Sequence, residues 1–398
     1  MDNKQNNQIR QIALFVASAC VLQVLESLIP HPIPGVRFGL ANMITLVVLI
    51  TIGFKAALEV AVLRTVVSSF ILGSFLSPSF ILSFSGSLGS ALIMGAVYAV
   101  SRNKRVLLFS IIGISIVGSI THNSIQILLV YVFFIKHKGI FMLVPYIGIS
   151  SVIMGWISGM IAVRVCKKLE TVSTGEPDAD YRVHMSSQKI KSQYIDLHSP
   201  IHRITPAIKI ISVIVMGCTL IIVRNITIYN LLFIFLLSIL FISRVSIRTI
   251  FSRLKKLSLL IVISFWMPLL FSKSGKIVMQ WGFLTVTDKG IQDGTVFAFR
   301  IVLLIIGSLL LTATTSPEEL TAGIRKILRP FRVFGISEER ISSIIITAWM
   351  YMPALGNKIR AGIKKNKFKK KKLKEVIPSI ADLVADMYKQ DESKEKPD

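Results

Sequence analysis

The sequence predicts an all-α polytopic membrane protein with a six-helix bundle, a four-span module and a set of amphipathic helices ending in a basic tail. Composition is the first reason, because 53% of the 398 residues are hydrophobic and only 17% are charged, whereas an average soluble domain has about 25% charged residues. Distribution is the second reason. The apolar residues gather in runs of about 14 to 25, a length that suits membrane helices when several such runs are present.

We expect six spans in the first half of the chain and four in the second half. The first six lie at about 11–30, 39–53, 56–75, 80–100, 106–134 and 139–163. The other four lie at about 207–223, 226–243, 257–271 and 293–314.

Polar segments separate and follow these spans. The mixed charges, glycine and proline of 169–199 indicate a linker, and the amphipathic, basic pattern after residue 315 indicates helices at or below the membrane surface. The predicted domains are therefore a membrane domain at 1–168, a cytoplasmic linker at 169–199, a second membrane domain at 200–315, and cytoplasmic helices with a basic tail at 316–398.

The positive charge predicts an orientation. The net charge is +25, but many Lys and Arg residues flank apolar runs and the rest crowd the C-terminus, which indicates membrane topology and not nucleic-acid binding. With the N-terminus inside the cell, the basic clusters at 102–105, 164–168 and 244–256 all fall inside, and Lys136 and Lys138 are the main exceptions. Ten spans then place both termini in the cytoplasm of a multi-pass cell-membrane protein.

The stretch GSITHNSIQ places His122, Asn123 and Gln126 inside an apolar span. Polar side chains within the membrane are costly and usually functional. His122 and Gln126 are four residues apart and so share a helix face. Two interpretations are open, hydrogen bonding to neighbouring helices or recognition of a polar ligand group, and we favour the ligand, with Asn42 and Arg64 as further candidates. No second His or Cys stands at helical spacing, so a metal site is not expected.

Small and acidic residues mark other positions in the first half. The stretch SFSGSLGS, residues 83–90, spaces small residues either for close helix packing or for a cavity wall. Ala13 and Ala17 form an A-x-x-x-A strip on the first span, which suits contact with another helix. Glu26 and Glu59 lie near the ends of spans, where they either reach the membrane interface or pair with an internal cation.

The first half resembles a known family over about residues 9–165. It is similar to the Gx transporter family, also labelled heptaprenyl diphosphate synthase component I, in the blocks ESLIPHPIPGVRFGLANMITLVVL, GFKAALEVAVLRTVVSSFILGSFLSPSFILSFSGSLGS and GISIVGSITHNSIQILLVYVFF. The resemblance implies a six-helix substrate-binding (S) component of energy-coupling factor vitamin transporters. In such components a strip matched here by Ala13 and Ala17 contacts the transmembrane coupling (T) component.

The synthase label finds no support in the residues. Prenyl diphosphate synthases hold magnesium diphosphate through Asp-rich motifs such as DDxxD, because hard cations prefer carboxylates, and this chain has no paired Asp. Catalysis of prenyl transfer is therefore not expected. The alternative that stays open is a membrane accessory subunit in prenyl diphosphate or quinone biosynthesis.

The second half resembles the T component of energy-coupling factor transporters over about residues 197–385. Its segment SPIHRITPAIKI is similar to the opening of that family, with His202, Arg203, Pro206 and Lys209 in matching places. The resemblance implies that the C-terminal helices dock onto two cytoplasmic ATPases and carry ATP-driven movement to the S component. The chain has no GxxxxGK[ST] motif, so we expect no cofactor in this chain and ATP hydrolysis by the partner subunits.

The C-terminus departs from the T-component pattern, because lysines stand where Ala-Arg-Gly motifs are expected. The basic residues that we assign to ATPase coupling are Arg360, Lys364, Lys365, Lys367, Lys369 and Lys370. Lysine lacks the planar fork of arginine. Three interpretations are open: coupling in a lysine form, divergent ATPases, or lost coupling with the lysines binding anionic lipid.

Together the two resemblances predict a natural fusion of the S and T components of an energy-coupling factor-type transporter. This membrane subunit would serve the uptake or export of a small organic compound, driven by separate ATPases, and it would not be an enzyme. The expected partners are two cytoplasmic ATPase subunits, the small organic substrate and anionic lipid at the basic tail, with no nucleic acid.

Overall fold

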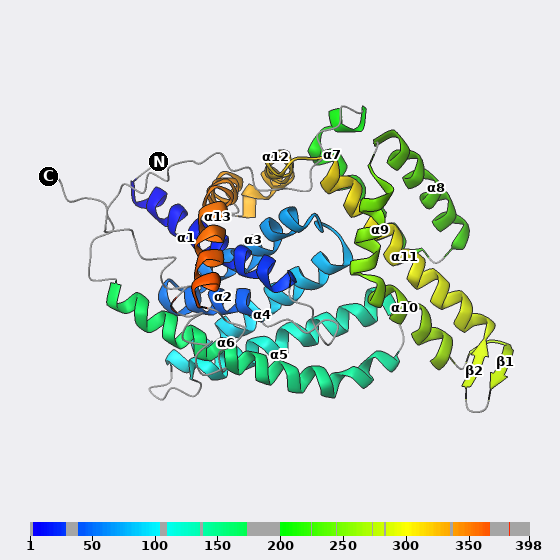
Figure 1. Cartoon of the computed structure of the whole chain (residues 1–398), viewed down its shortest axis with the longest axis horizontal. Helices are drawn as coiled ribbons and strands as arrows, with labels where there is room; N and C mark the ends of the chain where they lie inside the picture. Colours follow the sequence, from blue (N-terminus) through cyan, green and yellow to red (C-terminus); the bar gives the residue numbers. More distant parts are fainter. Residues whose placement is uncertain are drawn as a thin grey trace.

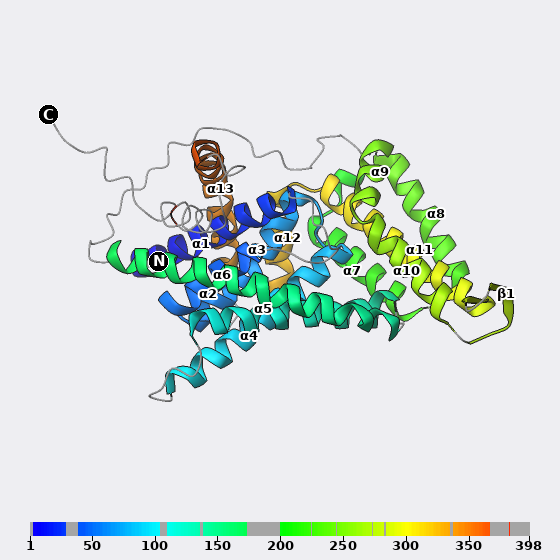
Figure 2. The same cartoon turned by 60° about the horizontal axis from the view of Figure 1, so that its bottom comes forward.

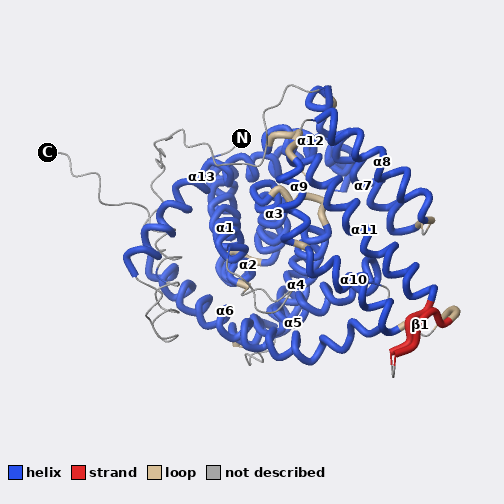
Figure 3. Tube along the Cα trace, turned by 45° about the vertical axis from the view of Figure 1, so that its right-hand side comes forward, coloured by secondary structure: helices blue, strands red, loops and turns tan. Residues whose placement is uncertain are grey.

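The computed structural model describes residues 3–28, 39–103, 110–135, 138–172, 200–334, 337–366 and 382, and within 200–334 it leaves out 224, 244, 273, 282 and 283. The described residues are almost entirely helical, which confirms the predicted all-α membrane class. Among the described residues, β-strands form a short hairpin at one end of the molecule (Figure 3). Most of the predicted linker and nearly all of the basic tail lie outside the described residues.

The first half of the described chain folds into six α-helices where the sequence predicts six spans. They are α1 (Asn3–Leu28), α2 (Leu40–Thr51), α3 (Phe54–Leu72), α4 (Pro78–Asn103), α5 (Ile111–Leu129) and α6 (Val144–Val172) (Figure 1). A π-helical turn, Val130–Ile135, and a 3₁₀ turn, Lys138–Leu143, connect α5 to α6. Gly73 follows α3 with a φ of 57°, a left-handed conformation that glycine adopts without strain.

The second half holds the remaining helices. They are α7 (Pro206–Ile222), α8 (Ile226–Ser243), α9 (Ile247–Lys256), α10 (Ser258–Phe271), α11 (Asp288–Ala313), α12 (Pro317–Leu328) and α13 (Glu338–Asn366), with 3₁₀ turns at Pro200–Arg203 and Arg329–Phe334. Ser316 begins α12 with a capping box, because its hydroxyl accepts from the Glu319 amide and the Glu319 carboxylate accepts from the Ser316 amide.

The hairpin between α10 and α11 was not anticipated from the sequence. Its antiparallel strands are β1 (Ile277–Trp281) and β2 (Leu284–Thr287). The segment is rich in β-branched and aromatic residues, which favour strands, but it is short and follows an apolar run. Its last residue, Thr287, also caps α11, since its hydroxyl accepts from the Gly290 amide at 3.1 Å.

Length and composition let five of the described helices cross a membrane, with up to six if the bent pair of α9 and α10 forms one span. The five are α4, α5 with its π-helical extension, α6, α8 and α11. The two helices of the bent pair meet at 60°, and α2 and α7 are apolar but shorter. The number of ten spans therefore stays a prediction, as does the position of the two termini.

The helices differ in how deeply they are buried. Most of α11 is buried, whereas most residues of α5 and α6 are exposed or half-buried. Large apolar side chains lie on that exposed face, among them Leu128, Tyr146, Ile149 and Trp156. An exposed apolar face of this extent suits contact with lipid. We therefore place α11 inside the group of helices that includes α8, α9 and α10 (Figure 2), and we assign the exposed faces of α5 and α6 to contact with lipid.

The two halves pack on each other through three buried groups. In the first group, α13 lies along α1, and Ile344 and Ala348 join a core with residues of α1, α2, α3 and α6 (Figure 1). In the second, Phe134 of the π-helical turn packs among residues of α8 and α11. In the third, Phe75 of the turn between α3 and α4 packs with residues of α7, α11 and α12. The chain is therefore one packed assembly of helices in which both halves contribute to each contact.

Candidate functional site

A polar cavity lies where α1, α2, α3, α4 and α5 meet. Its lining residues are Gln23, Glu26, Gly39, Ala41, Asn42, Arg64, Ser83, Ser119, His122 and Asn123. We name it the Arg64 cavity. Its volume is about 40 Å³, which is room for about two or three water molecules. Side chains therefore fill most of the space between these helices.

Four of the five predicted substrate-binding residues line the Arg64 cavity, namely Asn42, Arg64, His122 and Asn123. The fifth, Gln126, lies one turn further along α5, where its Nε2 is 3.0 Å from Nε2 of His122. Asn123 also ties α5 to α6, because its Nδ2 donates to Ser151 Oγ at 2.7 Å. The fold thus brings together polar residues of three helices, while their role in binding stays a prediction.

Arg64 is a buried cation that donates to side chains of three neighbouring helices, α1, α2 and α4. Arg64 is only 4% exposed. Its Nη2 donates to Ser87 Oγ at 2.6 Å and to Asn42 Oδ1 at 3.4 Å. Its Nη1 donates to Gln23 Oε1, also at 3.4 Å. Burying a charge is costly unless strong partners compensate, and of these three bonds the one to Ser87 is the shortest. An anionic or acceptor group of a ligand in this cavity would form a further charge-assisted hydrogen bond with the guanidinium.

Glu26 and Glu59 lie in different environments. Glu26 is buried in the Arg64 cavity, where its Oε1 accepts from the Gly39 amide at 2.8 Å. Glu59 forms a bidentate ion pair with Arg340 of α13, in which Nε and Nη2 each lie 3.1 Å from a carboxylate oxygen. An internal cation does pair with Glu59, but it belongs to the other half of the chain. The Arg64 cavity therefore carries one positive and one negative side chain.

The small residues of 83–90 serve both purposes that the sequence left open. Ser90 is fully buried and bridges helices, because its Oγ accepts from Asn42 Nδ2 at 3.2 Å and donates to the Gly118 carbonyl at 2.8 Å. Ser83 instead lines the cavity wall. Helix packing and cavity formation are thus properties of the same stretch.

Close approach of α4 to α5 fixes the position of His122. A Cβ atom at position 86 would lie 3.0 Å from the carbonyl oxygen of His122 and 3.1 Å from its ring. Gly86 therefore gives α5 the space that a larger residue would fill. On the same side of α5, Gln126 Nε2 donates to the Leu82 carbonyl at 3.5 Å, which is a weak bond.

We expect Gly86→Val to destabilise the protein by about 1–3 kcal/mol, because the added carbons overpack the contact with His122. Gly148→Val is the matched control, since a Cβ atom at position 148 of α6 meets nothing within 4 Å. Thermal unfolding of the two variants in detergent measures the difference. Equal unfolding temperatures for the two variants would contradict the assigned contact.

The residues that match the opening of the T component anchor α7. Pro206 is the first residue of α7, where proline suits the helix. Lys209 is buried, and its Nζ donates to the Thr314 carbonyl at 2.8 Å and to Thr315 Oγ1 at 3.3 Å. It thereby ties the start of α7 to the end of α11. Arg203 is exposed and lies just before α7.

Arg300 is a further buried cation, and the sequence did not lead us to predict it. It is fully buried in the middle of α11, where its Nη1 donates to the Phe133 carbonyl at 2.6 Å and its Nε donates to Tyr229 Oη at 3.1 Å. Its guanidinium also lies 5.3 Å from the centre of the Phe297 ring, within cation–π range. A lone arginine inside an apolar run was the signal that could have identified it.

The predicted contact and coupling residues have different outcomes. Ala13 and Ala17 are fully buried in the core group that contains Ala348 of α13. Arg360, Lys364 and Lys365 fall within the bounds of α13, but their side chains are outside the described part of the chain. The predicted positions Lys367, Lys369 and Lys370 lie outside the described residues altogether.

Comparisons with known proteins match each half separately. Residues 15–165 match the family model described as heptaprenyl diphosphate synthase component I. Residues 198–385 match the family model described as cobalt transport protein. These matches confirm the two resemblances that the sequence motifs predict.

Individual relatives match the second half. The energy-coupling factor transporter transmembrane protein EcfT of Thermosediminibacter oceani is 32% identical over 163 residues, which are 41% of this chain and 61% of the relative. The protein of the same name from Listeria innocua is 29% identical over 217 residues, 52% of this chain and 82% of the relative. That of Brevibacillus brevis is 32% identical over 163 residues, 41% of this chain and 62% of the relative.

The match thus spans about three-fifths of the length of two of these relatives. The relatives are transporter components and not enzymes, in agreement with the class predicted for this chain. The chain therefore joins a first half similar to heptaprenyl diphosphate synthase component I to a second half similar to the transmembrane protein of energy-coupling factor transporters.

Proposed function

We propose that this chain is a membrane subunit of an energy-coupling factor-type transporter that carries the substrate-binding part and the coupling part in one polypeptide. One observation carries the proposal. A second half similar to the transmembrane protein of such transporters packs, through α11 and α13, on a first half that encloses a buried polar cavity. Separate cytoplasmic ATPases would supply the energy, and a small organic compound would be the cargo.

The chemistry of the Arg64 cavity supports a small polar organic substrate. Arg64, Glu26 and the amides of Asn42 and Asn123 offer a positive charge, a negative charge, donors and acceptors within one enclosure. Binding sites for small molecules typically combine a few such groups in a mostly apolar surround. The volume of about 40 Å³ admits water alone, so the lining side chains would move apart to admit a substrate.

Contacts between the halves support a movable first half. With the predicted orientation, the turn between α3 and α4 is outside the cell and the end of α11 is inside. Yet Thr312, near the end of α11, donates to the Gly73 carbonyl at 3.1 Å, and Ser308 donates to the Phe75 carbonyl at 2.6 Å. The turn between α3 and α4 meets the end of α11 if the first half of the chain is turned relative to the second half. A cavity that opens to the outside of the cell would then require the first half to turn back.

The ion pair between Glu59 and Arg340 offers a way to test the link between α13 and the first half. Both side chains are partly exposed, so the pair contributes at most about 1 kcal/mol to stability. We expect Arg340→Glu to reduce ATP-dependent uptake in proteoliposomes severalfold while leaving the unfolding temperature nearly unchanged. The double variant with Glu59→Arg should restore part of the uptake because it restores opposite charges. Full uptake by the single variant would show that this pair does not transmit movement.

The basic tail would serve ATPase coupling, lipid binding or both. Arg360 and the lysines from Lys364 to Lys370 provide the charge for either role. Charge reversal of Lys369 and Lys370 separates the two. Loss of uptake with unchanged binding to vesicles of anionic lipid would indicate ATPase coupling, and the opposite result would indicate a lipid contact alone.

Purification of the tagged full chain from its own cells tests the proposed function. Cytoplasmic ATPase subunits that co-purify in stoichiometric amount would support it. A second candidate function is favoured by the family model that matches the first half, a membrane accessory subunit in prenyl diphosphate or quinone biosynthesis. A soluble prenyl synthase that co-purifies in place of ATPases would overturn the transporter proposal and establish this second candidate.

A further inference from the structure

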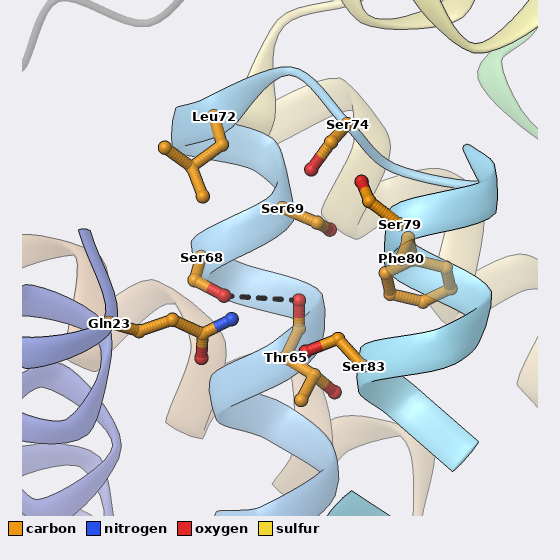
Figure 4. Close-up of a pocket in the computed structure, with 9 residues that line it drawn as sticks. All are labelled: Gln23, Thr65, Ser68, Ser69, Leu72, Ser74, Ser79, Phe80 and Ser83. Atoms are coloured by element: carbon orange, nitrogen blue, oxygen red, sulfur yellow. Dashed lines mark hydrogen bonds between the residues drawn. The ribbon is translucent and has the colours of Figure 1, made fainter. Parts of the chain in front are cut away.

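A second cavity adjoins the Arg64 cavity and has a different lining. It lies between α1, α3 and α4, and its polar wall consists of one amide, from Gln23, and six hydroxyl groups, from Thr65, Ser68, Ser69, Ser74, Ser79 and Ser83 (Figure 4). We name it the serine cavity. None of the described residues that line it carries a charge. Gln23 and Ser83 line both cavities, so the two spaces are neighbours that share a wall.

The hydroxyl groups of α3 have their protons already committed. Thr65 Oγ1 donates to the Val62 carbonyl at 2.7 Å, and Ser69 Oγ donates to the Val66 carbonyl at 2.6 Å. Ser68 Oγ likewise donates to the Thr65 carbonyl at 3.3 Å, the bond drawn in Figure 4. A hydroxyl group has a single proton and two lone pairs. The α3 wall therefore presents hydrogen-bond acceptors to the cavity.

The opposite walls complete the enclosure. Figure 4 shows Gln23 reaching from α1 toward Ser68 and Thr65, with Ser79 and Ser83 on α4 facing them across the space. The three hydroxyl-bearing residues of the α3 wall, Thr65, Ser68 and Ser69, are each at most 3% exposed. Buried acceptors without a fixed positive charge suit a group that donates N–H or O–H bonds. A carboxylate or phosphate would instead face lone pairs along the α3 wall, where the three hydroxyl protons already bond to carbonyl groups.

We propose that the serine cavity holds a hydrogen-bond-donating, non-anionic part of the transported compound, such as amide, amine or hydroxyl groups, while the Arg64 cavity holds its acceptor-rich or anionic part. This inference rests on the proposed transport function and adds the class of substrate. The substrate is therefore a compound with two unlike ends. Gln23 connects the two sites, because the Oε1 atom of its amide group accepts from Arg64 and the same side chain lines the serine cavity.

The test uses the full chain purified in lipid nanodiscs and the organic compound that stays bound to it, identified and quantified by mass spectrometry. We expect a compound with N–H or O–H donors at one end and an acceptor or anionic group at the other. Thr65→Val and Ser69→Ala should each lower its retention about three- to tenfold, since each removes one hydrogen-bond acceptor from the α3 wall.

Two matched variants control for loss of a hydroxyl group as such. Thr121→Val removes a hydroxyl group that donates to the Val117 carbonyl of its own helix at 2.8 Å, and Ser18→Ala removes a fully buried one that donates to the Leu14 carbonyl at 2.8 Å. Neither residue lines a cavity described here. Both should retain the compound as the unaltered chain does.

The outcomes separate the two proposals. Unchanged retention in Thr65→Val and Ser69→Ala, together with loss in Arg64→Met, would mean that the serine cavity contains water only, and would overturn this inference while leaving the transport function standing. A bound compound without donor groups would also overturn it. A chain that retains no organic compound at all would overturn both proposals.

Discussion

The variant Arg64→Met is expected to lose at least about tenfold in retention of the bound compound. Among the described residues that line the Arg64 cavity, Arg64 is the one Lys or Arg, and a hydrogen bond to a charged group contributes about 1.5–3 kcal/mol. The same change leaves Asn42 Oδ1 and Gln23 Oε1 without the donor that they share, at a cost of about 1–3 kcal/mol in stability. Mass spectrometry of the bound compound and thermal unfolding measure the two effects.

A control distinguishes lost binding from a loosened fold. Ser87 accepts the shortest bond of Arg64, at 2.6 Å, but does not line the cavity. Ser87→Ala should therefore lower the unfolding temperature while retaining most of the bound compound. Arg64→Lys keeps the charge without the planar fork and should give an intermediate retention. If Arg64→Met retains the compound fully, the assignment of this cavity as the substrate site is wrong.

The helices of this fold could be predicted well from the sequence because apolar runs of span length are strong signals. The predicted span at about 226–243 agrees with α8 (Ile226–Ser243), and the one at about 207–223 agrees with α7 (Pro206–Ile222). The hairpin before α11 was missed, because a short strand pair carries little periodic signal beside an apolar run.

The candidate site was partly predictable for a related reason. Polar residues such as His122 and Arg64 stand out in apolar spans, and the fold gathers them around one cavity. Glu26 was noticed only as a residue near the end of a span. The six hydroxyl groups of the serine cavity were not recognised, because serine and threonine are common in membrane helices and their direction of bonding is set by the folded structure.

Partners far apart in the chain were beyond the reach of sequence patterns. Glu59 and Arg340 are 281 positions apart, and no spacing rule connects them. The carbonyl group that accepts from Arg300 belongs to a π-helical turn. In such turns the backbone hydrogen bonds join residues five apart and not four apart, and the residues VYVFFI carry no pattern that predicts one. Tertiary contacts decide both features.

Arg300→Met is expected to give the largest loss of stability, about 3–5 kcal/mol. Arg300 stands in the middle of α11, where a charge is costly. Two hydrogen bonds from the guanidinium compensate this cost, one to the Phe133 carbonyl and one to Tyr229 Oη, each of about 1.5–3 kcal/mol. Methionine fills a similar volume but supplies neither bond. Thermal unfolding of the detergent-solubilised variant measures the loss.

The two bonds of Arg300 have different consequences, which a comparison of two single variants can separate. Tyr229 Oη accepts from Arg300 and donates to the Leu220 carbonyl at 2.6 Å, so this branch joins helices within the second half. The Phe133 branch joins α11 to the first half. Tyr229→Phe should cost about 1–2 kcal/mol and should not change uptake per folded molecule.

Arg300→Met should reduce ATP-dependent uptake per folded molecule in addition to lowering stability, because it releases the π-helical turn from α11. If the two variants lower uptake equally at matched stability, the bond to Phe133 serves only to hold the fold together. If Arg300→Met alone uncouples uptake from ATP hydrolysis, then α11 acts on the first half through the bond from Arg300 to the Phe133 carbonyl. The comparison thus decides whether this buried arginine transmits movement or only compensates for its own burial.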